Sequence, residues 1–261
     1  MKYKIVGLLC IILTISPSYS QSDDFNVGNK CVSNRKSSSD FNINNERIVK
    51  AIIFDIGNVL VKVDLNLWQD GFNKIGVNIP KNMLQNNKLS ELVYSYTEGK
   101  INTSTFVSRF SNALGVEEIP ENEFKMAWNF VILSLHLDAI ENLQKFRNSG
   151  YKIYALSDNN HMHSEYIDEL YQQIYPDKSF FDLFDKVFLS QEIGFRKTSD
   201  EAWLYLLKDQ KLKPEECLFV DDMLINITRA KKLGLHVFHY ETGSDMSKVL
   251  ETIQAINLKS I

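Results

Sequence analysis

The sequence predicts an α/β fold, in which a parallel β-sheet covered by helices carries a separate group of helices inserted after its first strand. Five short apolar runs rich in β-branched and aromatic residues recur along the 261 residues, and helix-like stretches separate most of them. Such alternation is typical of a parallel sheet. With 44% apolar residues, the chain is long enough for one substantial core and a smaller appended unit.

The first run, from Ile48 to Phe54, is nearly uninterrupted and ends at Asp55-Ile56-Gly57-Asn58, as expected for a strand buried on both faces. The four later runs that predict strands are Lys152–Leu156, Lys186–Leu189, Cys217–Val220 and Leu235–His239.

The first two runs are separated by roughly ninety residues, whereas a plain crossover needs only about a dozen. Four stretches there have apolar residues at helical spacing: Leu65–Ile75, Ser90–Tyr96, Thr103–Leu114 and Glu121–Leu133. A further helix over Leu137–Ser149 resumes the core. We therefore predict a core of residues 48–64 and 135–261 with a helical cap of residues 65–134.

The N-terminal segment predicts export. Residues 1–20 carry two lysines, then an apolar run from Ile5 to Ile15, then a small polar tail, which is the layout of a secretory signal peptide. The run is about half the roughly 20 residues that span a bilayer, so cleavage after Ser20 is favoured over an anchor and no stable membrane insertion is expected. Residues 21–47 are rich in Ser, Asn and Asp and predict a flexible leader.

Charge and cysteine content limit the possible partners. The formal net charge of −4 would become −6 after loss of residues 1–20, so a non-specific nucleic-acid binder is disfavoured. Cys31 and Cys217 would remain, and either two free thiols or a disulfide is compatible with export.

Polar residues follow four of the predicted strands where those strands end. Asp55 follows the first, Ser157 to Asn160 the second, Arg196-Lys197 the third after a few residues, and Asp221-Asp222 closes the fourth. Ligands of open parallel sheets bind beyond the carboxyl ends of the strands. One polar residue there is usually a helix cap or turn former, but four in succession predict a site.

These residue types suit phosphate chemistry. A carboxylate can accept a phosphoryl group covalently and split a hard hydrolysis into two easier displacements. Because carboxylate and phosphate repel, a divalent cation with oxygen ligands must screen them, and a lysine and hydroxyl or backbone donors must neutralise the remaining charge. Asp55, Asp221, Asp222, Lys197 and Ser157 supply these groups.

Four segments resemble the motifs of haloacid dehalogenase-like hydrolases, in the form found in the bacterial glucose-1-phosphate phosphatase group. They are Phe54-Asp55-Ile56-Gly57-Asn58-Val59-Leu60-Val61, Leu156-Ser157-Asp158-Asn159-Asn160, Leu189-Ser190-Gln191-Glu192-Ile193-Gly194-Phe195-Arg196-Lys197, and Phe219-Val220-Asp221-Asp222 with Asn226 and Ala230-Lys231-Lys232-Leu233-Gly234. The resemblance covers roughly residues 48–240, with the motifs in the family's order.

This resemblance implies a Rossmann-like core, a cap that closes over a small phosphorylated substrate, and a Mg²⁺ cofactor. Asp55 would be the nucleophile. Mg²⁺ would be held by an Asp55 carboxylate oxygen, the Gly57 carbonyl and Asp222, with Asp221 assisting. The phosphate would be contacted by Asn58, Ser157, Asp158 and Lys197.

Two positions depart from the family pattern. Many phosphatases of the superfamily have an aspartate as general acid and base two residues after the nucleophile, where this chain has Gly57. The loss favours activated esters or a proton donor elsewhere, and Asp64 is a candidate donor, although a lone carboxylate entering a helix is more often a cap. Thr198 stands where the third motif commonly has proline. Without the fixed φ of proline, we expect the turn that carries Lys197 to be looser.

The favoured function is an exported Mg²⁺-dependent phosphatase of small phosphomonoesters, with sugar phosphates as the best substrate class. Gly57 and Thr198 also fit a non-catalytic binding or effector protein that retains the fold. A dehalogenase uses an aspartate nucleophile but needs no metal, so the Asp221-Asp222 pair counts against it. The sequence leaves the substrate and the oligomeric state open.

Overall fold

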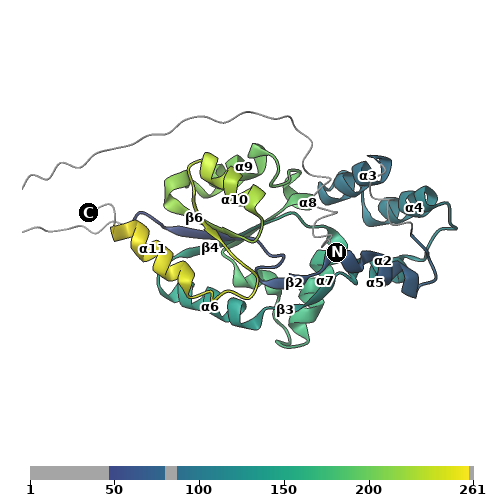
Figure 1. Ribbon diagram of the computed structural model, residues 1–261, viewed down its shortest axis with the longest axis horizontal. Helices are drawn as coiled ribbons and strands as arrows, with labels where there is room; N and C mark the ends of the chain where they lie inside the picture. Colours follow the sequence, from purple (N-terminus) through teal and green to yellow (C-terminus); the bar gives the residue numbers. More distant parts are fainter. Residues whose placement is uncertain (1–46, 80–86, 259–261) are drawn as a thin grey trace, which may run out of the picture.

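The computed structural model describes residues 47–79 and 87–258. Figure 1 shows the sheet with its covering helices, and beside it a second group of helices, α2 to α5. The predicted signal peptide, most of the predicted leader and Cys31 lie outside the described residues. Within the described ranges, no helix combines the length and apolarity that crossing a membrane requires.

The core is a five-stranded parallel sheet in the order β5-β4-β1-β6-β7. The strands are β1 (Ala51–Phe54), β4 (Lys152–Ser157), β5 (Lys186–Leu189), β6 (Cys217–Asp221) and β7 (His236–His239). The predicted α/β class is thus confirmed. The first strand begins three residues later than the apolar run, at Ala51, although the N–H of Lys50 still bonds the Glu216 carbonyl oxygen next to β6.

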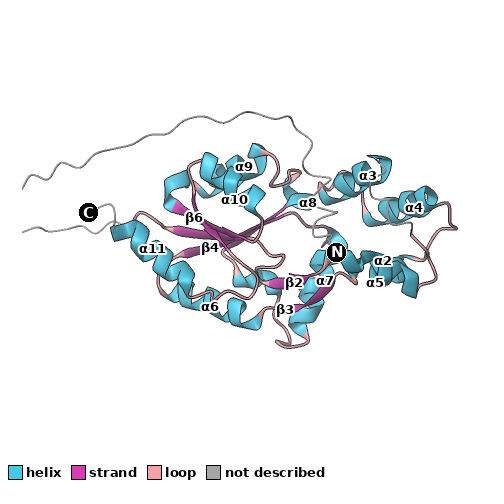
Figure 2. Ribbon diagram, viewed as in Figure 1, coloured by secondary structure: helices cyan, strands magenta, loops and turns pink. Residues whose placement is uncertain are grey.

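Helices cover both faces of the sheet, as Figure 2 shows. Alternate residues of β1 point to opposite faces. Ile52 and Phe54 belong to the core cluster shared with α6 (Leu137–Asn148), α7 (His161–Gln172) and α11 (Lys248–Leu258). Ala51 and Ile53 belong to the cluster shared with α9 (Asp200–Gln210) and α10 (Leu224–Lys232). Both faces are buried, which is why β1 reads as a continuous apolar run.

The cap helices are η1 (Leu65–Leu67), α2 (Trp68–Lys74), α3 (Asn87–Thr97), α4 (Thr103–Leu114) and α5 (Glu121–Asn129). Their core is mostly aromatic: Phe72, Phe106, Phe110 and Phe124 are fully buried. The centre of each of these rings lies within 6 Å of the centres of at least two others, in edge, stacked or tilted contact. These aromatic side chains therefore pack one cap helix against another.

The prediction of a helix over Glu121–Leu133 was wrong at its end. The helix α5 stops at Asn129, and Ile132–Leu135 forms strand β3, which pairs antiparallel with β2 (Val61–Val63). A short apolar run fits either structure by periodicity, and the partner strand β2 had no assignment in the sequence. The N–H of Asp64 bonds the Val131 carbonyl oxygen where the cap joins the core. The domain boundaries themselves stay predictions.

The remaining elements are short connections: η3 (Phe180–Leu183), α8 (Ser190–Ile193) and η4 (Pro214–Glu216). Of these, α8 matters most for the site, because it separates β5 from Lys197 and faces the cap helix α3.

Candidate active site

The sheet brings the predicted site residues to one edge. Asp55 directly follows β1, Ser157 ends β4 and Asp221 ends β6. The strands β4 and β6 flank β1 on either side. Because parallel strands end at the same edge, Asp55 lies between the other two residues.

Three carboxylates form a cluster at this edge. One oxygen from each of Asp55, Asp221 and Asp222 lies within 4.8 Å of the others. Asp55 and Asp221 are buried, while Asp222 is partly exposed. The Asn226 amide donates to both oxygens of Asp221, at 3.2 and 3.1 Å, which fixes that carboxylate.

Lys197 lies in the middle of the acidic groups. Its Nζ is 2.8 Å from Asp55 Oδ2 and 2.8 Å from Asp221 Oδ2, and its side chain is only 3% exposed. Burial alone would lower the pKa of Lys197, but Asp221, Asp55 and Asp158 together raise it above the usual lysine range. Lys197 is therefore a permanent cation at this site.

One lysine does not compensate the charge of the four carboxylates around it, of which Asp55 and Asp221 are buried. Burial raises the pKa of Asp55 to about 6, against the opposing effect of Lys197 and with a further rise from Asp221. Burial likewise raises the pKa of Asp158, Asp221 and Asp222. The excess of negative charge and the all-oxygen donor set fit a hard divalent cation such as Mg²⁺. Asp55, Asp221 and Asp222 are the side chains that would hold it.

The turn that follows β1 contacts the acidic cluster through Asn58. Asn58 adopts a left-handed backbone conformation with φ of 53°, and its Oδ1 accepts from the Val63 N–H at 3.1 Å. Its side chain also hydrogen-bonds Asp222, which partly opposes the rise that burial causes in the pKa of that carboxyl. Gly57 bridges to Val61 and has open space where a side chain would begin, since an added Cβ would meet only Val63 Cγ2 at 4.0 Å.

The end of β4 and the loop that follows it carry Ser157 and Asp158, two of the residues predicted to contact phosphate. Ser157 is 4% exposed, and Asp158 Oδ1 accepts the backbone N–H of Lys197 at 2.7 Å. Asp158 therefore links the second and third motifs. The N–H of Asn159 donates to Ser190 Oγ at 2.9 Å, which joins the same loop to the start of α8.

Sequence reasoning missed a polar contact between this loop and the cap. The Trp128 Nε1–H of α5 donates to Asn160 Oδ1 at 3.3 Å, and His163 Nδ1 lies 3.0 Å from Asn160 Nδ2. Burial lowers the pKa of His163 to about 4, so the imidazole is neutral at pH 7. Asn160 belongs to the second motif, but nothing in the sequence indicates its partner 32 residues away.

The candidate proton donor Asp64 and the departure at Thr198 both lie in hydrogen-bonded turns. Asp64 Oδ1 accepts from the Asn66 backbone and side-chain amides at 2.9 and 2.8 Å, so this carboxylate caps η1. Thr198 lies in a turn closed by the Ser199 N–H and the Arg196 carbonyl oxygen at 2.9 Å. This turn exists without proline.

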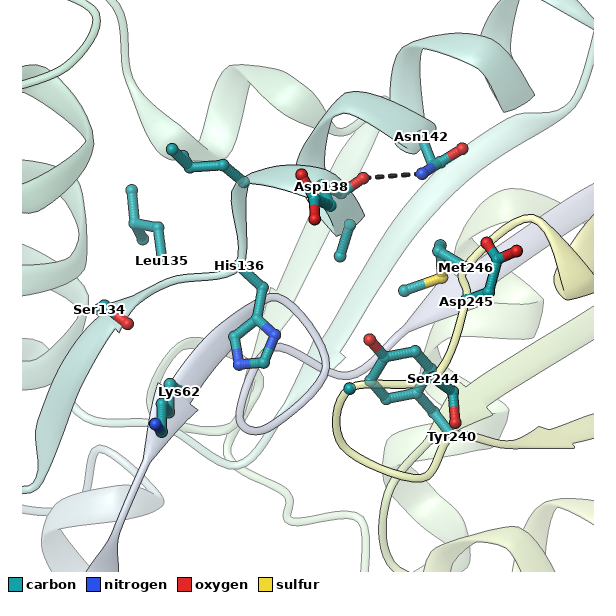
Figure 3. Close-up of a pocket in the computed structure, with 13 residues that line it drawn as sticks. Lys62, Ser134, Leu135, His136, Asp138, Asn142, Tyr240, Ser244, Asp245 and Met246 are labelled. Carbon is teal, nitrogen blue, oxygen red and sulfur yellow. Dashed lines mark hydrogen bonds between the residues drawn. The ribbon is translucent and has the colours of Figure 1, made fainter.

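A cavity of about 630 Å³ lies apart from these residues. Its walls come from β2, from the end of β3 with the start of α6, and from the loop after β7, and His136 and Tyr240 project from different walls (Figure 3). None of the predicted site residues lines it.

The fold and the site together define a hydrolase class in which an aspartate, a lysine and an acidic pair meet at the carboxyl edge of a parallel sheet. Residues 49–234 match the haloacid dehalogenase-like hydrolase family. The chain belongs to this family, and the predicted superfamily is confirmed. Membership of the glucose-1-phosphate phosphatase group stays a prediction.

Known relatives cover nearly the whole of this fold. The chain is similar to a D-ribitol-5-phosphate phosphatase of Bacteroides thetaiotaomicron, with 29% identity over 79% of this chain and 98% of the relative. A haloacid dehalogenase family enzyme of the same organism, solved in complex with magnesium and inorganic phosphate, has a TM-score of 0.69 at 25% identity over 77% of this chain and 98% of that one. A hydrolase of Porphyromonas gingivalis shares the fold, with a TM-score of 0.70 at 22% identity over 79% of this chain and 98% of its own.

Proposed function

We propose that this chain is an exported, Mg²⁺-dependent phosphatase that hydrolyses small phosphomonoesters through an aspartyl-phosphate on Asp55. Sugar and polyol phosphates are the proposed substrate class, supported by the similarity to a D-ribitol-5-phosphate phosphatase. The observation that carries the proposal is the position of Asp55, which shares Lys197 with Asp221 and lies within 4.8 Å of Asp222.

In the first step an Asp55 carboxylate oxygen attacks phosphorus, the new O–P bond forms and the P–O bond to the alcohol breaks. Lys197 neutralises the charge on the phosphoryl oxygens, which the hydroxyl of Ser157 and backbone donors of the loop after β4 also contact. In the second step water attacks phosphorus, releasing inorganic phosphate and restoring Asp55. A bound Mg²⁺ supplies charge neutralisation between the carboxylates and the phosphate.

The leaving alcohol oxygen needs a proton, and because Gly57 has no group to give one, the oxygen departs as an alkoxide that takes its proton from water. Asp64 is engaged in capping η1 and is partly exposed. The proposed enzyme therefore releases good leaving groups fastest, such as glycosyl or aryl phosphates, and alkyl phosphates more slowly.

The proposal is tested by phosphate release from the protein lacking residues 1–20, over sugar phosphates, polyol phosphates, nucleotides and an aryl phosphate, with Mg²⁺ or chelator. We expect Mg²⁺-dependent release that Asp55→Asn abolishes and the matched control Asp70→Asn, on the exposed first turn of α2, retains. A folded protein that binds Mg²⁺ but releases no phosphate would favour the non-catalytic alternative. Halide release that a chelator does not affect would favour a dehalogenase.

Export is a separate part of the proposal and rests on the first 20 residues. Expression of the full chain in a secreting bacterial host should yield a protein whose N-terminal sequence begins at Gln21. A cell-associated protein that retains Met1 would contradict it.

A further inference from the structure

The C-terminal turn of α3 is one of the places where the cap contacts the core. Gly99, with φ of 66°, ends this turn, and a Cβ added there would lie 2.1 Å from the Gln191 carbonyl oxygen of α8. Tyr96 is fully buried, and its hydroxyl oxygen accepts the Met162 N–H of α7 at 3.3 Å. The contact tolerates only a glycine at position 99, so the turn is seated directly on the core backbone.

An ion pair lies beside this seat. Arg196 Nε donates to Glu98 Oε1 at 3.0 Å, and both side chains are only 17% exposed. The Arg196 guanidinium carbon is 3.9 Å from the centre of the Tyr94 ring, which also belongs to α3. Shielding from solvent and the aromatic face make this pair stronger than an exposed surface pair. We call Tyr94, Glu98 and Arg196 the clasp.

The core side of the clasp directly precedes Lys197. The core fixes the Lys197 backbone from two directions, because its N–H donates to Asp158 Oδ1 at 2.7 Å and its carbonyl oxygen accepts the Trp203 Nε1–H at 3.0 Å. Arg196 adds a third restraint, which comes from the cap. Lys197, whose Nζ lies 2.8 Å from both Asp55 Oδ2 and Asp221 Oδ2, directly follows Arg196 in the chain.

We propose that Glu98 and Arg196 are positioning residues, which place Lys197 for phosphate binding only when the cap is seated on the core. The inference rests on the proposed function and deepens it, since it ties the position of the phosphate-binding lysine to the state of the cap. Neither residue contacts the phosphate, and both act through Lys197.

Loosening the clasp has a kinetic signature. Lys197 stabilises the charge that develops on the phosphoryl group, so its displacement lowers kcat more than it raises KM. We expect Glu98→Gln and Arg196→Gln each to lower kcat about tenfold, with KM changed less than about threefold, because small misplacements of a catalytic group have effects of this order or larger. Glu98 also pairs with Lys100 at 2.6 Å and Arg196 also lies over Tyr94, but the two residues share one ion pair. The loss in the double variant should therefore be smaller than the product of the two single losses.

The chain offers a matched control. Lys125 of α5 and Glu165 of α7 also join cap and core, at 3.1 Å, but they are 35% and 59% exposed and do not adjoin Lys197. The variant Glu165→Gln breaks this pair and should leave kcat within about twofold, as expected for an exposed ion pair.

The experiment measures kcat and KM for the wild type and these variants, with hydrogen exchange of residues 190–199 as a readout that needs no turnover. The variant Gly99→Ala should also separate the cap from the core, because an added Cβ pushes the end of α3 away from α8. It leaves the charges of Glu98 and Arg196 in place. The proposal predicts faster exchange and lower kcat in Glu98→Gln, Arg196→Gln and Gly99→Ala, with neither change in Glu165→Gln.

Three results would each contradict the proposed role of the clasp. They are an unchanged kcat in the clasp variants, a loss in the double variant equal to the product of the single losses, and an equal loss in Glu165→Gln. If the wild type releases no phosphate, the proposed function fails. Hydrogen exchange then still tests whether the clasp restrains the segment around Lys197. Unchanged exchange of residues 190–199 in the variants contradicts this restraint, and faster exchange supports it.

Discussion

Asp55 carries an unusually high pKa of about 6, because burial and the neighbouring Asp221 outweigh the effect of Lys197. Only the deprotonated carboxylate can attack phosphorus. A carboxyl with this pKa is partly protonated in mildly acidic solution, where an exposed aspartate is fully ionised. If Asp55 is the nucleophile, as proposed, activity should fall in mildly acidic solution, which gives the pH profile an acid limb within a measurable range.

The pH dependence follows from this protonation. We expect kcat/KM to rise with pH and to level off above about 6, since protonation of Asp55 removes the nucleophile. Added cation stabilises the charged carboxylate, so the limb should move to lower pH as Mg²⁺ is raised. Profiles at low and saturating Mg²⁺ measure this, and a limb that moves to higher pH with Mg²⁺ would contradict it.

Gly57 offers a gain-of-function test at the residue scale. The structure leaves room for a side chain there, with Val63 Cγ2 at 4.0 Å as the contact of an added Cβ. We expect Gly57→Asp to raise kcat for alkyl phosphates by roughly tenfold to a hundredfold, because a proton donor reaches the leaving oxygen. An aryl phosphate should change little, and Gly57→Asn, which has the same shape without the acid, should give no gain. An equal gain for both substrates would argue against proton donation.

At the scale of single elements, the sequence predicts best where local signals agree. The predicted helix Thr103–Leu114 matches α4, because Asn102 caps its start by accepting the Thr105 N–H and left-handed Gly115 ends it. The strand β3 was missed because its pairing with β2 spans the whole cap. Local patterns cannot show a partner that distant.

The helix α9 connects core packing to the site, and Trp203 is its main contact. Trp203 is 1% exposed, packs edge-on against Phe219 of β6 and donates to the Lys197 carbonyl oxygen. We expect Trp203→Ala to lower the free energy of unfolding by about 3–5 kcal/mol, as for other large buried aromatic residues. Chemical denaturation measures this, with the exposed neighbour Leu204→Ala as control. A loss below about 1 kcal/mol would show that Trp203 is not an anchor of the core.

At the scale of the whole molecule, the acidic cluster should couple metal binding to stability. A cation that binds only the folded state stabilises it by about 2.7 kcal/mol at one hundred times its Kd. We expect Mg²⁺ to raise the melting temperature of the wild type and a chelator to reverse the rise. The variant Asp222→Asn removes one charge of the cluster and should reduce the shift strongly. Equal shifts in both proteins would place the cation elsewhere.

The sequence also predicts how the distant parts of the core converge, but not how the cap joins them. Asp55, Lys197 and Asp221 meet because parallel strands end at one edge, which the order of the apolar runs already indicates. The pair of Glu98 and Arg196 is 98 residues apart in sequence. Two charged residues on separate predicted elements look like solvent-exposed side chains until the packing of the cap on the core is known.

Trapping the phosphoryl group tests the central claim most directly. The protein is mixed with Mg²⁺ and the best substrate, quenched in acid during turnover, digested and analysed by tandem mass spectrometry. The account predicts one phosphoryl group on the peptide that contains Asp55, dependent on Mg²⁺ and absent in Asp55→Asn. Turnover that persists in Asp55→Asn, or a phosphoryl group on another residue, would contradict it.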